Sequence, residues 1–453
     1  MPHDEITPVS IRSPGPGTPR RCGIRRGRAP VPGRPCRCSC GSCDARRGRR
    51  PSTPVDARRG RETRMRVGRI VIVGGGLAGV RTAERLRRAG HDGPVTLVGA
   101  EPHAPYDRPP LSKKLLTQDD EPAEPPFLRG VDGVESLAGV RATALHTAGR
   151  SLTLDNGCSL DFGRLVIATG VRPRTLPAFD GWSGVHMLRT WADCLALRAA
   201  LRAAERVTVV GGGVLGCEIA ASARTLGLEV ALVEMLAQPL AAVLGSEVGS
   251  VVASLHRAHG VDVHCSTRVD RLEGPGGTVE RVVLADGRVL ETDLVVVAAG
   301  AVPNTEWLAS SGLTLADGVV CDRTGTTSAE DVFAVGDVAR LPHPWADGTV
   351  RLEHWTSAGD TAALVARNLL ADPADRTGLT TVPYFWTDQY RAKLQVVGLP
   401  DPTDELTVVE GSLVDGPFVA TWTRAGVLTG AVTVGMPAAL GRYRKLVGAP
   451  ATG

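Results

Sequence analysis

The chain has few aromatic residues. Phe, Trp and Tyr make up 4% of its 453 positions, whereas 43% of the positions are hydrophobic. Its core must therefore be mainly aliphatic. Long apolar runs are also missing: the longest, LVVVAAGAV at residues 294–302, is far shorter than the ~20 residues that a helix needs to cross a bilayer. We therefore expect no transmembrane segment and no membrane partner.

Beyond residue 64 the sequence also lacks an excess of positive charge. Residues 1–64 contain 16 Arg and 5 acidic residues, a net charge of +11, whereas residues 65–453 contain 36 basic and 43 acidic residues, a net charge of −7. The overall charge of +4 therefore comes from the leader. Composition gives no support for nucleic-acid binding by the remainder of the chain.

The leader, residues 1–64, has no aromatic residue and is rich in Arg, Pro and Gly. This composition predicts a disordered extension, and no apolar stretch of secretory-signal length follows the arginines. We expect the native start at Met65, which would make the leader foreign to the native protein. The leader includes a string, CRCSCGSC, whose thiolates could bind zinc. No second ligand pair follows at finger spacing, so the disordered alternative is favoured and no metal is assigned; the string's cysteines are Cys36, Cys38, Cys40 and Cys43.

The later cysteines are dispersed and have no paired spacing. This pattern fits buried thiols in a reducing cytoplasm better than a disulfide framework. We therefore expect a cytoplasmic protein. The five residues are Cys158, Cys194, Cys217, Cys265 and Cys321.

A first glycine-rich loop follows the run RIVIV at residues 69–73, which predicts a parallel strand buried on both faces. A helix over 77–90 and a second strand over 95–99 follow, with Glu101 just past that strand. The whole stretch is a βαβ unit whose helix N-terminus can face a pyrophosphate. The loop has GxGxxG spacing, at Gly74, Gly76 and Gly79.

A second loop repeats this pattern. Residues 206–210 predict a strand, 214–227 a helix, and 229–234 a strand ending in Glu234. A carboxylate at this point can accept both hydroxyls of an adenosine ribose and would repel a 2′-phosphate, which favours NADH over NADPH. The loop glycines are Gly211, Gly213 and Gly216.

Either loop alone could be a glycine-rich turn in another α/β protein. Two complete units on one chain instead indicate two dinucleotides, with electrons passing between them. Further strands end at Gly170 and Gly300, and VFAVGDVA at 332–339 runs into Gly336 and Asp337. The carboxylate of Asp337 could hydrogen-bond a flavin ribitol.

Four further segments narrow the family: PYDRPPLSKKLL (105–116), LRTWADCLALR (188–198), RLEHWTSAGD (351–360) and VPYFWTDQYRAKLQVVG (382–398). With the two loops, they make residues 65–453 resemble the FAD-dependent ferredoxin reductases of ring-hydroxylating dioxygenase and cytochrome P450 systems. The resemblance implies an α/β fold with two Rossmann-like dinucleotide-binding domains and a small C-terminal α+β domain. The implied domains are FAD-binding (65–174 and 298–378), NAD-binding (175–297) and C-terminal (379–453).

The resemblance also implies site residues. It places Lys113 beside a non-covalent FAD and Glu218, in the second helix, facing Lys113. A fixed ammonium would stabilise the charge of reduced flavin, although a lone surface charge is the alternative. The chain has only four Lys against 48 Arg, so a Lys at this position is suggestive. The other implied flavin-contacting residues are Ala78, Ala142, Arg189, Asp337 and Trp355.

The sequence departs from this pattern at two positions. Ala100 stands where relatives carry the ribose-binding acid, so either Glu101 takes over or the ribose is held otherwise. Ala242 stands where relatives often carry Arg. Arg108 and Arg172 either face phosphate or flavin, or are surface charges.

The resemblance implies that NADH reduces FAD, which passes electrons to a [2Fe–2S] or Rieske-type ferredoxin feeding an oxygenase or P450. Disulfide reductases and NADH peroxidases of this architecture need cysteine within residues 66–157, where this chain has none. Two alternatives stay open: the flavin subunit of a nitrite or nitric-oxide reductase, and an apoptosis-inducing-factor-like flavoprotein that acts by binding. Both monomer and homodimer are compatible with the sequence. Candidates for steering an acidic ferredoxin are Arg108, Lys114, Arg391 and Lys393.

Overall fold

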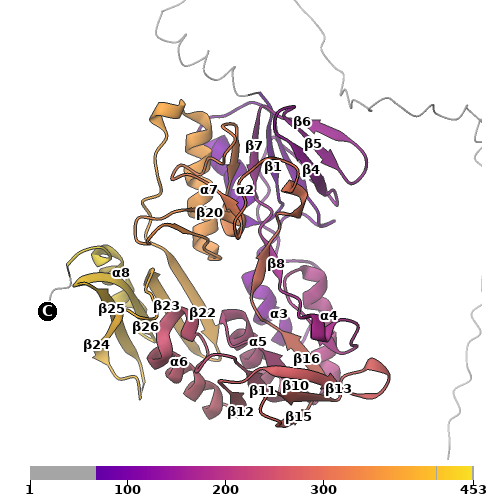
Figure 1. Ribbon diagram of the computed structural model, residues 1–453, viewed down its shortest axis with the longest axis vertical. Coiled ribbons are helices and arrows are strands. Elements are labelled where there is room, and N and C mark those ends of the chain that lie inside the picture. The colour runs from indigo at the N-terminus through magenta and orange to yellow at the C-terminus, as the bar shows by residue number, and fades with distance from the viewer. Residues whose placement is uncertain (1–67, 415, 451–453) are drawn as a thin grey trace, which may run out of the picture.

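The computed structural model describes residues 68–414 and 416–450. Its first sheet is parallel and has the strand order β19-β7-β1-β2-β3. Helices α2 (Leu77–Arg88) and α7 (Trp355–Leu370) pack against each other beside this sheet, in the upper half of Figure 1. The strands are β1 (Ile70–Val73), β2 (Val95–Gly99), β3 (Val134–Ala138), β7 (Arg164–Ile167) and β19 (Val332–Ala334).

The second sheet, in the lower half of Figure 1, is also parallel and has the order β12-β11-β10-β16-β9. Its strands are β9 (Val185–His186), β10 (Arg206–Val210), β11 (Glu229–Val233), β12 (Val261–His264) and β16 (Leu294–Val297). The associated helices are α4 (Trp191–Ala203), α5 (Val214–Thr225) and α6 (Ala241–Ala258).

Two short strands connect the halves. β8 (Val171–Pro173) leaves the first sheet region and pairs antiparallel with β17 (Ala301–Pro303), which returns from the second. The chain thus builds the second sheet after β7 and comes back to complete the first with β19. The β8–β17 pair therefore carries the chain from the first sheet to the second and back.

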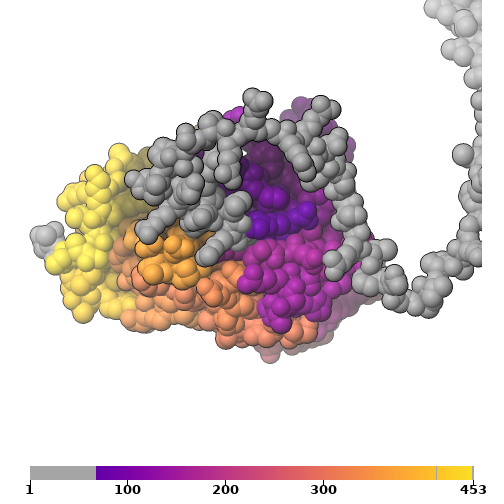
Figure 2. Space-filling view, turned by 90° about the horizontal axis from the view of Figure 1, so that it is seen from above, coloured from indigo at the N-terminus to yellow at the C-terminus, as the bar shows by residue number. Residues whose placement is uncertain are grey.

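The C-terminal unit is an antiparallel sheet of order β22-β23-β26-β25-β24 followed by α8 (Pro437–Leu446). In Figure 2 it forms one end of the body, with the segment around residue 350 beside it. Its strands are β22 (Tyr384–Gln389), β23 (Ala392–Gly398), β24 (Glu405–Gly411), β25 (Phe418–Arg424) and β26 (Val427–Val434).

The remaining elements lie in the connections. One small antiparallel sheet consists of β4 (Ala142–His146), β5 (Ser151–Leu154) and β6 (Ser159–Asp161), and a second consists of β13 (Val269–Glu273), β14 (Arg281–Leu284) and β15 (Val289–Glu291). A third small sheet, with both parallel and antiparallel pairing, consists of β18 (Val319–Val320), β20 (Ala339–Pro342) and β21 (Thr349–Val350). The short helical turns are η1 (Pro109–Ser112), α3 (Lys114–Thr117), η2 (Pro177–Phe179), η3 (Pro275–Gly277), η4 (Glu306–Leu308), η5 (Gly336–Val338) and η6 (Pro373–Asp375).

One aliphatic core crosses the boundary between the second sheet and the C-terminal unit. Cys217 and Ile219 of α5 pack in the same cluster as Phe385 of β22 and Leu394 of β23. Leu111, from the turn that precedes α3, belongs to this cluster as well. Three segments far apart in sequence are therefore fixed relative to one another by shared burial.

The expected strands and helices of both βαβ units are present, which confirms the α/β fold with two dinucleotide-binding halves and a C-terminal α+β unit. The helices end two residues earlier than the patterns 77–90 and 214–227 suggest. No helix in 68–414 or 416–450 is long and apolar enough to cross a membrane. The cysteine string of the leader lies outside the described residues.

Candidate active site

Both glycine loops connect the end of a buried strand to the start of a helix. Gly74 has φ +127°, and a Cβ there would lie 2.1 Å from the Ala168 carbonyl oxygen; Gly211 has φ +108°, and a Cβ would lie 2.4 Å from that of Ala298. Any side chain at these positions would therefore collide with the neighbouring strand. The loops need glycine for a backbone path that brings each helix start close to the sheet edge.

The helix starts are suited to an anion. α2 begins after Gly76 and α5 after Gly213, and neither N-terminus is capped by a side chain. A Cβ on Gly213 would meet nothing within 4 Å, so this start faces open space. Uncapped N–H groups at a helix N-terminus attract phosphate. The loops thus fit two pyrophosphate groups, such as those of FAD and NADH; Gly79 and Gly216 allow the close helix–strand packing.

Glu234 lies against the second loop. Its Oε2 accepts a hydrogen bond from the Gly212 amide at 2.6 Å, and its Oε1 accepts one from the Leu236 amide at 2.7 Å. Each carboxylate oxygen has a second lone pair, so both can still accept a ribose hydroxyl. The backbone therefore holds this acid in the place where the sequence predicts a ribose contact.

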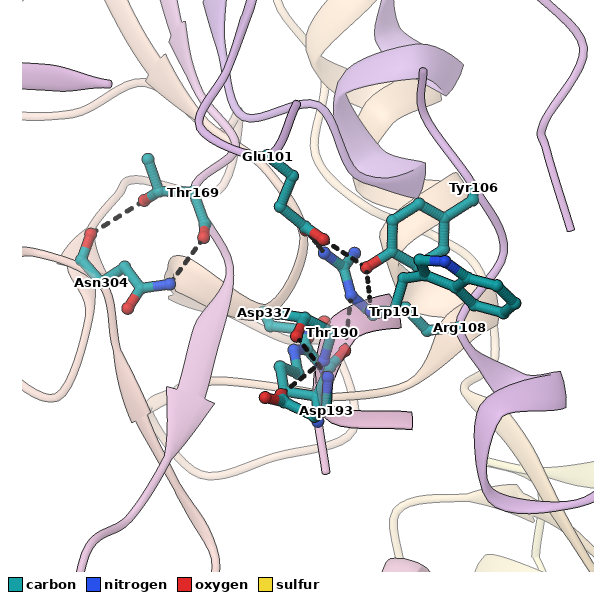
Figure 3. A network of polar contacts seen from close by, with 10 residues as sticks. Glu101, Tyr106, Arg108, Thr169, Thr190, Trp191, Asp193, Asn304 and Asp337 are labelled. Atoms are coloured by element: carbon teal, nitrogen blue, oxygen red, sulfur yellow. Dashed lines mark hydrogen bonds and ion pairs between the residues drawn. The ribbon is translucent and has the colours of Figure 1, made fainter. Parts of the chain in front are cut away.

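Glu101 has partners of a different kind. Its carboxylate accepts hydrogen bonds from the Tyr106 hydroxyl and from Arg108 Nη2, the latter at 2.7 Å, as Figure 3 shows. Burial, followed by the bond to Glu101, raises the pKa of Tyr106 to about 12. As in Glu234, each oxygen of Glu101 has one donor and a second lone pair, so the contacts with Tyr106 and Arg108 do not exclude a further bond to a ribose hydroxyl. Tyr106 was not among the predicted site residues, although it belongs to the PYDRP segment.

Arg108 lies at the first loop and is not a free surface charge. Besides Glu101, its Nε donates to the Arg189 carbonyl oxygen at 3.2 Å, and its Nη1 would lie 3.0 Å from a Cβ on Gly76. Arg172, by contrast, is half exposed and pairs with Glu306. Arg108 is therefore placed beside the first loop, whereas Arg172 forms a surface ion pair.

Asp337 lies in η5, just after β19, and pairs with Arg189 at 3.0 Å. Arg189 is itself anchored, because its backbone amide donates to Asp193, which forms a capping box with Thr190 at the start of α4. The contacts are drawn in Figure 3. Gly336 has φ +69°, and a Cβ there would lie 2.8 Å from that of Ala78, so α2 packs directly on this turn.

Lys113 and Glu218 are in contact, as the sequence predicts. Lys113 Nζ lies 2.7 Å from Glu218 Oε2, and the carboxylate is almost fully buried, with 4% of the residue exposed. Two further groups reach the same carboxylate: Ser112 Oγ donates to Oε2 at 2.6 Å and Thr387 Oγ1 donates to Oε1 at 2.9 Å. Sequence reasoning missed Ser112 and Thr387, although both lie within the quoted motifs.

Trp355 opens α7 and is partly exposed, with its Nε1 donating to Asp107 at 2.7 Å. Its ring meets Trp386 edge-on, at 6.0 Å between centroids, whereas Phe385 is buried in the core.

His354 directly precedes Trp355. Burial lowers the pKa of His354 to about 4, so that imidazole is neutral at pH 7.

The remaining predicted residues lie at loop and strand ends. Gly170 follows β7 and has Arg189 Nη2 3.4 Å from the position of a Cβ, while Gly300 precedes β17. Ala142 is buried at the start of β4. Lys114 and Arg391 are exposed. Lys393 is also exposed; it pairs with Asp388 at 3.6 Å and lies over the Trp386 ring.

Buried thiols are unsuited to redox chemistry. Burial raises the pKa of Cys194 to about 11 and that of Cys321 to about 12, and it raises the pKa of Cys217 as well. All three therefore stay protonated at pH 7. Within 68–414 and 416–450, no group of three or more His, Cys, Asp or Glu side chains is arranged to hold a metal ion.

Comparison with known proteins identifies the family. Residues 68–362 match the pyridine nucleotide-disulphide oxidoreductase family, and residues 384–452 match the reductase C-terminal family. The chain therefore belongs to the pyridine nucleotide-disulphide oxidoreductases.

Its curated relatives are reductases of electron-transfer systems. It is 36% identical to rhodocoxin reductase of Rhodococcus erythropolis, covering 77% of this chain and 82% of that protein. It is also 36% identical to the ferredoxin–NAD(+) reductase component of the anthranilate 1,2-dioxygenase system of Burkholderia cepacia, covering 84% of this chain and 94% of the relative. Among solved structures, putidaredoxin reductase in its covalent complex with putidaredoxin has a TM-score of 0.79 at 34% identity, covering 84% of this chain and 93% of that one.

Proposed function

We propose that the chain is an NADH-dependent, FAD-containing ferredoxin reductase that supplies electrons to an oxygenase or a cytochrome P450. The main support is the presence of two uncapped glycine-loop helix starts on one chain, together with the ion pair between Lys113, which lies between the two loops in sequence, and Glu218 of α5. The related reductases support this assignment. They do not favour a nitrite reductase subunit or an apoptosis-inducing-factor-like protein.

The presence of two parallel sheets supports the binding of FAD and NADH by different parts of the chain. FAD would be held by residues 65–174 and 298–378, NADH by 175–297, and 379–453 would form the C-terminal domain. When bound, FAD accepts a hydride from NADH and can release the two electrons singly. This property suits a one-electron carrier such as a [2Fe–2S] ferredoxin.

The residues of this chain would bind and orient the two cofactors. The N-terminus of α2 would hold the FAD pyrophosphate, and Asp337, fixed by Arg189, would contact the ribitol. The N-terminus of α5 and Glu234 would hold the adenosine end of NADH. Lys113, held by the buried carboxylate of Glu218, would stabilise negative charge on the reduced ring. The protonated thiols support electron exit without a protein disulfide. The dispersed spacing of the cysteines supports a cytoplasmic location.

Anaerobic visible spectroscopy tests the proposal. NADH should bleach the flavin absorbance of the purified protein. Cytochrome c reduction should require added [2Fe–2S] ferredoxin, and a Rieske-type ferredoxin is tested in parallel as a second electron acceptor. Absence of bleaching by NADH would overturn the assignment. Rapid NADH-dependent reduction of glutathione disulfide, without a need for ferredoxin, would also overturn it.

A further inference from the structure

The carboxylate of Glu218 accepts contacts from two segments that lie far from it in the sequence. Ser112 and Lys113 reach Oε2 from the turn before α3, and Thr387 reaches Oε1 from β22 of the C-terminal unit. Glu218 is 4% exposed, so water contributes little to its stabilisation. A buried carboxylate depends on such donors to stay charged.

The direction of the Thr387 hydrogen bond is set by its neighbours. Gln389 Nε2 donates to Thr387 Oγ1 at 3.4 Å, and a carboxylate has no proton to give, so the hydroxyl proton points to Glu218. Along β22, buried positions alternate with half-buried ones, and Phe385, Thr387 and Gln389 share the buried face. Phe385 packs into the same core as α5. The strand is thus locked in a register that presents the Thr387 hydroxyl to the carboxylate.

Lys113 has two partners, Glu218 Oε2 and the Pro109 carbonyl oxygen at 3.3 Å. With Oε1 held by Thr387, the carboxylate plane is fixed and Oε2 faces the ammonium. Without that hydroxyl, Oε1 loses its donor and the carboxylate can rotate about its last bond. The ammonium would then be held less firmly in one place.

We infer that Thr387 is a positioning residue of the reductase: through the carboxylate of Glu218 it fixes the ammonium of Lys113, so that the C-terminal domain helps to set the reactivity of the flavin. This inference rests on the proposed function. Thr387 acts through Glu218 and is not assigned a contact with either cofactor.

The test compares Thr387→Val with Thr387→Ser, which restores the hydroxyl. The matched control is Thr433→Val, because Thr433 is a fully buried threonine of the same sheet whose hydroxyl makes no hydrogen bond within the described residues. The readouts are the stopped-flow rate of flavin reduction by NADH and the flavin midpoint potential. Thr387→Val should slow reduction about tenfold and make the potential more negative; a tenfold change in a two-electron equilibrium equals about 30 mV.

Thr387→Ser and Thr433→Val should both stay close to the wild-type protein. If Thr387→Val does not accumulate as folded, FAD-containing protein, Thr387→Ala removes the same hydroxyl without placing an extra methyl group beside Glu218. Wild-type rate and potential in the folded variant that lacks the hydroxyl would overturn the inference.

A double-mutant cycle separates positioning from a general structural role. In a Glu218→Gln background, Thr387→Val should have no further effect on the flavin potential. Thr387 acts on Lys113 through the carboxylate of Glu218, and that carboxylate is already replaced. Additive effects of the two substitutions would overturn the inference. If NADH fails to reduce the wild-type protein, the proposed function itself fails. If the wild type is reduced and Lys113→Ala impairs it, but Thr387→Val matches Thr433→Val, only the positioning role fails.

Discussion

The carboxylate of Glu234 is hydrogen-bonded to the backbone amide of Gly212, at 2.6 Å, so the acid at the end of β11 is tied to the loop at the end of β10. The neighbouring strands β10 and β11 are paired along their full length, which keeps both ends in register. The backbone therefore fixes the position of the carboxylate that we propose sets the nucleotide preference.

Glu234→Ala should weaken the preference for NADH. The lost bonds to the ribose hydroxyls are worth about 1.5–3 kcal/mol for a charged acceptor, or about ten- to a hundredfold in kcat/KM with NADH. At the same time kcat/KM with NADPH should rise, because the carboxylate no longer repels the 2′-phosphate. Steady-state kinetics with both nucleotides measure the ratio, and Glu234→Gln, which keeps an acceptor but no charge, separates hydrogen bonding from repulsion. Equal kcat/KM for the two nucleotides in the wild-type protein would contradict this prediction.

Lys113→Ala should slow flavin reduction by about a hundredfold, since a fixed charge aimed at developing charge contributes on that scale. The flavin potential should become more negative. Lys114→Ala is the matched control, because the adjacent lysine is exposed. Stopped-flow reduction by NADH, without ferredoxin, is the measurement. Full ferredoxin-linked activity in Lys113→Ala would argue against a role for this ammonium.

Electron delivery to an acidic ferredoxin should weaken as salt rises, because the Debye length falls from about 10 Å at 0.1 M to 3 Å at 1 M. Replacing exposed Arg391 and Lys393 together by Ala should lower kcat/KM for ferredoxin a few-fold at low salt. The difference from wild type should vanish at 1 M salt. Arg271 of β13 and Arg288, in the turn between β14 and β15, are both exposed and give a control pair with the same change in net charge. An equal loss in both pairs would contradict local steering.

Stability should fall as the pH drops from about 6.5 to 4. Burial lowers the pKa of His343 from 6.5 to about 4. In this pH window the unfolded chain binds a proton at this histidine and the folded protein does not. The free energy of unfolding therefore falls, by up to about 3 kcal/mol below pH 4. His343→Leu should make the pH dependence of the denaturation midpoint shallower in this window, and the remaining slope should come from His256 and His354, whose pKa burial also lowers to about 4. An unchanged slope would show that His343 titrates normally in the folded protein.

Removing residues 1–64 should leave turnover and flavin content intact, because the segment has too little apolar surface to contribute to a folded core. The truncated and full-length proteins can be compared by flavin absorbance and by ferredoxin-linked activity. Loss of either in the truncated protein would indicate a role for the Cys36–Cys43 string.

The sequence by itself determined the two βαβ units and the loop glycines. Local rules are sufficient for the units, since β-branched runs, glycine spacing and helical periodicity all lie within about thirty residues. The Lys113–Glu218 pair came from the resemblance to a known family, because no local rule connects residues so distant along the chain.

Only the tertiary structure decided the partners of these residues. It placed Tyr106 and Arg108 on the carboxylate of Glu101, and it showed that Arg108 is less exposed than Arg172. It also brought Thr387, from the far end of the chain, onto the carboxylate of Glu218. Such contacts depend on how the aliphatic core joins α5 to β22, and packing between distant segments leaves no periodic signal in the sequence.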